Sequence, residues 1–83
     1  MKSQLSELLD PSISSYGVFI ADAFKHTEEG HLILDIVLDS DEVIDLNLVT
    51  EVSRVINKIL DDEKNILEDV EELDIYSKEK GED

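Results

Sequence analysis

Residues 32–60 read LILDIVLDSDEVIDLNLVTEVSRVINKIL, and the change of hydrophobic period within this stretch decides the fold. From residue 32 to residue 38 every second side chain is apolar, while Asp35 and Asp39 have the other parity, which is the pattern of a half-buried strand. Beyond the acidic turn the apolar residues recur with the 3.6-residue period of one helix face. They are Leu48, Val49, Val52, Val55, Ile56, Ile59 and Leu60. The stretch therefore predicts a strand and a helix that share one core.

A first helix is predicted upstream, because apolar residues there also follow a helical period. They are Leu5, Leu8, Leu9 and Ile13. Either Ser3 or Ser6 is expected to cap this helix. Pro11 either opens a second short turn or kinks the helix, and Gly17 ends it in the left-handed conformation.

Residues 18–26 predict the first strand. Its alternation is imperfect, which leaves two interpretations open, a β-bulge or burial on both faces. Residues 27–30 predict a hairpin turn with Gly30 at positive φ. The strand at residues 31–39 should then pair antiparallel with the first.

In the second half of the chain, Asp45 is the expected N-cap of a helix that ends near Leu60. Residues 65–70 fit either a helix or an ordered loop, and residues 73–76 suggest a short last strand. The order αββαβ predicts an α+β, two-layer domain, with a three-stranded mixed sheet and two helices packed on one face.

Composition narrows the class of protein. The 83 residues predict one domain at 1–77 and a charged tail at 78–83. Twenty-two acidic and seven basic residues give a net charge of −15, which repels phosphate backbones and anionic lipid and attracts basic proteins. There is no cysteine, no apolar run that could span a bilayer and no signal peptide, so a cytoplasmic location is expected.

The segment Asp39–Asp45, DSDEVID, superficially resembles a calcium loop. Counted from Asp39, loop position six is Ile44 where such a loop needs glycine, and position twelve is Thr50 where it needs glutamate. A solvated turn followed by a helix cap is the better interpretation.

No other cofactor, metal or catalytic site is predicted. His26 and His31 flank the hairpin tip, but the spacing fixes no third ligand beside them. The serines have no glycine elbow or partner base, and no phosphate-binding or dinucleotide motif is present. The sequence therefore indicates a binding protein and not an enzyme.

One alternative is an acyl carrier protein, because Asp39-Ser40 in a small acidic chain resembles the site of phosphopantetheine attachment in that family. Acyl carriers place an apolar residue after the serine and begin a helix there, whereas Asp41 follows here and the helix begins about five residues later. They are also all-helical, whereas residues 18–39 predict a hairpin.

The order of elements and several local strings resemble the N-terminal domain of the bacterial ribosome maturation factor RimP. The matching features are Pro11 in the first helix, Gly17 before the first strand, Asp22 within it, the alternating strand that ends at Asp39, the segment Ile44–Arg54, similar to the family's I-T-L-D-D-C-x-x-V-S-R, and the pair Leu60-Asp61. The family usually continues with S-S-P-G into a hinge and an SH3-like barrel, whereas Ser77-Lys78-Glu79-Lys80-Gly81 stands here. The proline-rich turn of the family is replaced by residues 65–71.

The resemblance implies a non-enzymatic ribosome maturation factor domain that binds the assembling small (30S) ribosomal subunit through a basic ribosomal protein. Direct contact with rRNA, a membrane or a small-molecule substrate is not expected. The candidate partner-binding residues are Asp39, Asp41, Glu42, Asn47, Glu51 and Arg54. The alternative is a generic acidic protein-interaction module or a mimic of nucleic acid.

Overall fold

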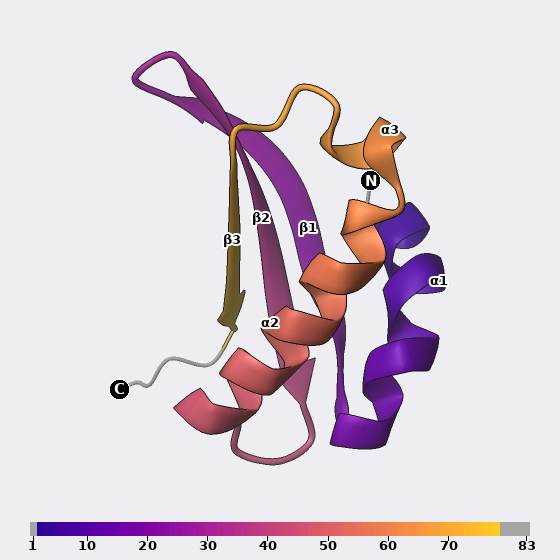
Figure 1. Cartoon of the computed structure of the whole chain (residues 1–83). Coiled ribbons are helices and arrows are strands. Elements are labelled where there is room, and N and C mark those ends of the chain that lie inside the picture. The colour runs from indigo at the N-terminus through magenta and orange to yellow at the C-terminus, as the bar shows by residue number, and fades with distance from the viewer. Residues whose placement is uncertain (1, 79–83) are drawn as a thin grey trace.

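Two helices cover one face of a three-stranded sheet, as the computed structural model of residues 2–78 shows (Figure 1). The elements are α1 Lys2–Ile13, η1 Ser14–Tyr16, β1 Val18–Glu28, β2 His31–Ser40, α2 Leu46–Asp61, α3 Lys64–Leu67 and β3 Glu72–Ser77. The predicted α+β architecture is confirmed. The predicted charged tail at 78–83 lies outside the described residues except for Lys78.

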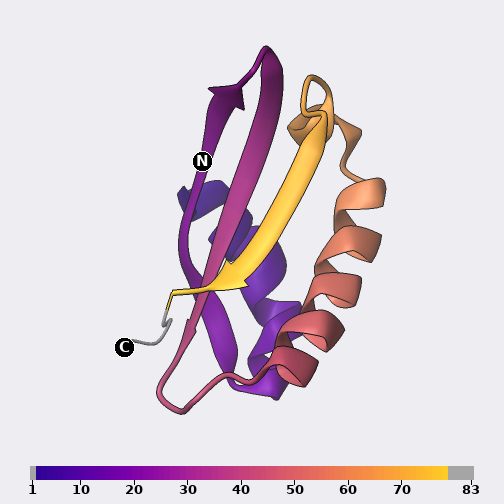
Figure 2. The same cartoon turned by 90° about the vertical axis from the view of Figure 1, so that its left-hand side faces the viewer.

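The central strand is β2, which pairs antiparallel with β1 and parallel with β3. A hairpin can join antiparallel neighbours, but parallel neighbours need a crossover, which α2 supplies here. Helix α1 packs on the same face of the sheet as α2. In Figure 2 the strands lie in front of α1, and α2 lies beside them. The sheet is therefore mixed, as the element order predicted.

The core lies between the sheet and the two longer helices. In β2 the core consists of the even-numbered apolar side chains that the sequence pattern predicted. Each helix contributes every third or fourth residue to the core. The fully buried large side chains are Leu5, Leu9, Ile13, Leu34, Ile36, Leu38, Val52, Ile56 and Leu60. Burial of each such side chain stabilises the fold by about 1.5–3 kcal/mol, before the opposing entropy of folding is counted.

A β-bulge explains the imperfect alternation of β1. The register passes from Ile20 opposite Leu38 to Asp22 opposite Val37, so Ala21 is the extra residue. The inserted residue shifts the parity, and the rest of β1 presents Asp22 and later even-numbered residues to the face away from the helices. The bulge is therefore the interpretation that the structure supports.

Both predicted left-handed glycines are confirmed. Gly17 has a φ of 80° and donates its N–H to the carbonyl of Ser14, 2.9 Å away, which ends the first helical segment. Glu29 and Gly30 form a two-residue hairpin loop with φ values of 53° and 83°. Positive φ at both positions is the type I′ geometry that matches the twist of a hairpin.

The predicted N-cap of the first helix was wrong. Ser3 and Ser6 both lie inside α1, so neither is its N-cap, and the helix continues through Pro11 to Ile13 without a second helix opening there. Ser6 donates its hydroxyl to Asp10 Oδ2 at 2.6 Å, and Asp10 Oδ1 accepts the backbone N–H of Ile20 at 2.9 Å. Asp10 therefore links α1 to β1 beside the bulge.

The second half of the chain follows the prediction closely. Asp45 caps α2, since its Oδ1 accepts the N–H of Leu48 at 2.8 Å, and the helix ends at Asp61, one residue beyond the expected end. The ambiguous segment 65–70 resolves into the end of the short helix α3 followed by a turn. Within residues 2–78, no helix has the length and apolar character needed to cross a bilayer.

Candidate functional site

The loop between β2 and α2 carries two of the predicted partner-binding residues. Asp41 and Glu42 are exposed, and neither forms an ion pair with another described residue. The N–H of Glu42 donates to Ser40 Oγ at 3.1 Å, which holds the backbone of the loop without using its carboxylates. Both acidic groups therefore remain available to a partner.

Val43 and Leu46 lie beside these carboxylates and are strongly exposed, at 89% and 79%. Ile44 between them packs against the core, and Asp45 turns its side chain to cap the helix, so the two flanking side chains point outward. The sequence analysis missed them as functional candidates. The sequence contained a signal that Leu46 is exposed, because Leu46 lies about 200° around the helix from Leu48 and so outside the apolar face of α2.

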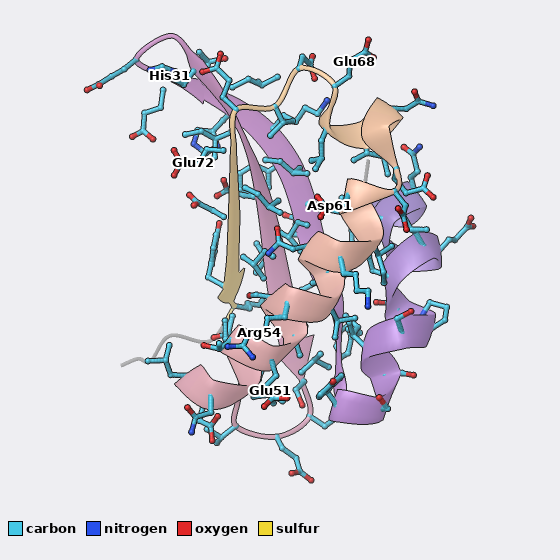
Figure 3. All side chains as sticks on the ribbon, viewed as in Figure 1. His31, Glu51, Arg54, Asp61, Glu68 and Glu72 are labelled. Carbon is cyan, nitrogen blue, oxygen red and sulfur yellow. The ribbon has the colours of Figure 1, made fainter. Side chains whose placement is uncertain are left out.

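Asn47, Glu51 and Arg54 are exposed between the start and the middle of α2, and Figure 3 labels Glu51 and Arg54 about one turn apart. A hollow of about 380 Å³ involves the loop and the end of η1. A second, shallower hollow lies on α2, and both include Leu48. The first is lined by Ser15, Tyr16, Gly17, Ser40, Asp41, Glu42, Val43 and Leu48, and the second by Asp45, Asn47, Leu48 and Glu51.

Five of the six predicted residues are exposed on the β2–α2 connection and the adjoining part of α2, a surface that we call the acidic shoulder. It consists of Asp41, Glu42, Asn47, Glu51 and Arg54, together with the exposed Val43 and Leu46. Asp39 does not belong to it. Asp39 pairs across the sheet with Phe19, which gives it the parity that faces away from the helices, and its Oδ1 accepts the N–H of Ser40 at 2.8 Å.

The sheet face away from the helices is a second candidate surface, which we call the open face. Three of its aromatic side chains are partly exposed, Phe19 at 42%, Phe24 at 40% and Tyr76 at 38%. In Figure 3 the labelled Glu72 projects from this face, on the side away from α2. By strand parity the open face consists of Phe19, Asp22, Phe24, His26 and Glu28 from β1, His31, Ile33, Asp35, Val37 and Asp39 from β2, and Glu72, Asp74 and Tyr76 from β3.

Asp35 lies at the centre of the open face and is buried, with 7% of its surface exposed. Tyr76 donates its hydroxyl to Asp35 Oδ2 at 2.7 Å. This hydrogen bond, with burial, raises the pKa of Tyr76 from 10.0 to about 12. Asp35 Oδ1 lies 3.4 Å from His26 Nδ1, but neither buried atom has a hydrogen-bond partner among residues 2–78.

Sequence reasoning missed the open face, although a signal was present. Ile33 and Val37 are apolar at the parity of β2 that was expected to face solvent, and both are buried. Apolar residues at both parities indicate a strand buried on both faces. The side chains that cover Ile33 and Val37 come from β1 and β3, and their positions depend on the bulge and the parallel register.

The two histidines do not meet at the hairpin tip. His26 faces Asp35 and lies 3.9 Å from Glu28, whereas His31 Nδ1 makes a hydrogen bond with the Glu71 carboxylate. That hydrogen bond and the charge of Glu71 raise the pKa of His31 above its ordinary value of 6.5. No group of three or more metal-ligating side chains forms in the described part of the chain.

Comparison with known proteins identifies the family. The family model described as the RimP N-terminal domain matches residues 8–77, which is most of the chain. No curated protein matches the sequence. The family consists of ribosome maturation factors that are in general not enzymes. With its αββαβ order and a match that runs from α1 to the end of β3, this chain belongs to the RimP N-terminal domain family.

Proposed function

We propose that this domain binds the assembling small (30S) ribosomal subunit in the cytoplasm, and that it acts by binding and not by chemistry. The acidic shoulder is the proposed docking surface, and its partner is a basic ribosomal protein. The observation that carries the proposal is the arrangement at the shoulder. There the carboxylates of Asp41 and Glu42 form no ion pair with a described residue and adjoin the exposed side chain of Val43. The exposed Leu46 follows at the start of α2. An apolar centre with a polar rim is the usual anatomy of a protein interface.

The class of partner follows from charge. At a net charge of −15 the domain repels the phosphates of rRNA at long range, so direct rRNA contact is disfavoured. Lysine-rich and arginine-rich proteins are attracted by the same field, which increases the rate of association. Arg54 is the one basic residue of the shoulder. Because its charge has the same sign as that of a basic partner, Arg54 helps to orient the partner and does not attract it.

The test is co-sedimentation of the chain with immature small subunits. The variant Asp41→Asn/Glu42→Gln removes two charges from the shoulder, and we expect about threefold weaker binding or more. The control Glu7→Gln/Asp61→Asn has the same net charge and alters two exposed residues of the helices that lie outside the shoulder. Unchanged binding of the shoulder variant at about 50 mM salt, where exposed charges are only weakly screened, would remove the proposal.

The net charge also favours a second candidate, a generic acidic module that occupies a basic protein by mimicking nucleic acid. The same experiment separates the two functions. A mimic does not cofractionate with small subunits, and its binding to basic proteins depends on total charge. The shoulder variant and its control would then lose affinity equally.

A further inference from the structure

We propose that the open face is a separate docking surface that binds arginine side chains of a basic protein segment. This goes beyond the proposed function, because it concerns the opposite side of the domain and a specific side-chain chemistry. Three observations support it: the register of the aromatic and acidic residues, the burial of Asp35, and the negative charge of the open face.

The register places rings next to carboxylates across the sheet. One row contains Phe24, Asp35 and Asp74, and the next contains Asp22, Val37 and Tyr76. Neighbouring strands lie about 4.8 Å apart, so each ring has a carboxylate of an adjacent row or strand within reach of one guanidinium group. A guanidinium can stack on a ring and donate to a carboxylate at the same time.

Asp35 provides the second observation. The residue is buried, with 7% of its surface exposed, and its Oδ2 accepts from Tyr76, but its Oδ1 makes no hydrogen bond with a described residue and has only the His26 ring 3.4 Å away. Buried polar atoms in folded proteins almost always have a hydrogen-bond partner, so this carboxylate oxygen can accept from a donor supplied from outside if the His26 ring moves away. The His26 ring beside it is 39% exposed and has Glu28 3.9 Å away as an alternative neighbour, so this ring can turn aside for an incoming donor.

Charge selects the partner. Sheet faces with exposed aromatic rings also bind single-stranded RNA by stacking, but six carboxylates on this face repel phosphates. They are Asp22, Glu28, Asp35, Asp39, Glu72 and Asp74. A second copy of the chain would bring an equally acidic face. Across the three strands, all of them described, Lys25 is the single lysine or arginine, and it has the helix-side parity and pairs with Asp69 at 3.2 Å.

Arginine fits this face better than lysine for a geometric reason. The guanidinium is planar, stacks on aromatic rings and donates two parallel hydrogen bonds to a carboxylate, whereas an ammonium group is a compact, strongly hydrated charge. A segment with arginine at alternate positions would present its side chains to one face of the sheet. The inference is therefore specific to the side chain and does not rest on net charge alone.

The test is an NMR titration of the isotope-labelled 83-residue chain with three probes: a glycine-arginine repeat peptide with four arginines, the matched lysine peptide, and a single-stranded oligouridylate. We expect the arginine peptide to shift the amide signals of residues 22–26, 33–37 and 72–76. Its affinity should exceed that of the lysine peptide by about threefold or more, because ring stacking distinguishes the two cations. Oligouridylate should shift none of these signals.

Two variants and one control sharpen the test. Asp22→Asn/Asp74→Asn should weaken binding of the arginine peptide about fivefold, and Phe24→Leu about threefold, because each removes one part of the stacked and hydrogen-bonded contact. Glu7→Gln/Asp61→Asn, with the same net charge as the first variant, should change the affinity less than about twofold. If a variant fails to fold, the map of shifts on the unmodified chain still decides the question.

Three results would overturn the inference. The first is equal weakening by the open-face variant and its control, which indicates a diffuse field. The second is a map confined to residues 41–54, and the third is binding of oligouridylate to the open face. None of these depends on small subunits, so loss of co-sedimentation in the shoulder variant and failure at the open face are distinguishable.

Discussion

The helix-covered face and the open face belong to the same three strands, but their apolar side chains are buried in different ways. On the covered face, two helices bring apolar side chains that enclose Leu34, Ile36 and Leu38 completely. On the open face, Ile33 and Val37 are buried only by neighbouring side chains of the sheet, among which are half-exposed rings and carboxylates. One face is therefore enclosed by the helices, whereas the apolar centre of the other is covered only by side chains of the sheet itself.

The two faces also hold a carboxylate differently, since Asp10 at the helix side is partly buried and Asp35 on the open face is buried. Asp10, at the helix side, uses both oxygens, one for the Ser6 hydroxyl and one for the N–H of Ile20. Asp35, on the open face, uses one oxygen for Tyr76, while the other makes no hydrogen bond within residues 2–78 and lies 3.4 Å from His26 Nδ1. The satisfied group fixes a contact between elements, whereas the incompletely satisfied one is a candidate for recognition.

The largest expected effect comes from matched truncations on the two faces. Ile36→Ala should lower the free energy of unfolding by about 2–5 kcal/mol, because the enclosed site cannot collapse around the cavity. Ile33→Ala should cost about half as much, since neighbouring side chains on the open face are free to move into the space. Denaturant unfolding of both variants measures the difference. Equal costs would mean that the open face is packed as rigidly as the core.

A smaller effect is expected at Tyr76. The hydrogen bond to Asp35 and burial raise its pKa above 10.0, to about 12, so the stability that this bond contributes is present below pH 10 and is lost as the pH rises through about 12. Ultraviolet titration, with Tyr76→Phe to subtract Tyr16, measures this pKa. In Asp35→Asn the pKa of Tyr76 should fall toward 10.0. An unchanged value would show that Asp35 does not hold the hydroxyl.

The smallest effect concerns the exposed pair His31 and Glu71 at the end of the sheet. Since the pKa of His31 is raised above 6.5, the pair stabilises the folded state below pH 6.5, and this contribution is lost as the pH rises through the raised pKa. NMR titration of the imidazole should give a value above 6.5, and Glu71→Gln should return it toward 6.5. A pKa of His31 that does not respond to this substitution would contradict the assigned cause.

Sequence alone predicted much of the acidic shoulder. Three local features are sufficient for this prediction: the period of β2, the cap at Asp45 and the apolar face of α2. They place Asp41, Glu42 and Asn47 in or next to the solvated connection between β2 and α2. Local rules did not separate Asp39 from this group, because the last residues of a strand alternate between the two faces. They also assigned the helix cap to Ser3 or Ser6, where helix propensity continues past both residues.

What the sequence determined by itself is the order αββαβ, the two left-handed glycines, the cap of α2 and the acidic character, since each depends on neighbouring residues or on composition. The tertiary structure alone decided that Ala21 is the bulged residue, that β3 pairs with β2 in the register that sets Asp74 beside Asp35, and that Tyr76 and His26 both lie against Asp35 on the open face. These facts join residues up to 50 positions apart, from His26 to Tyr76. Pairing over such distances is set by the packing of whole elements against one core, which no local pattern of side chains encodes.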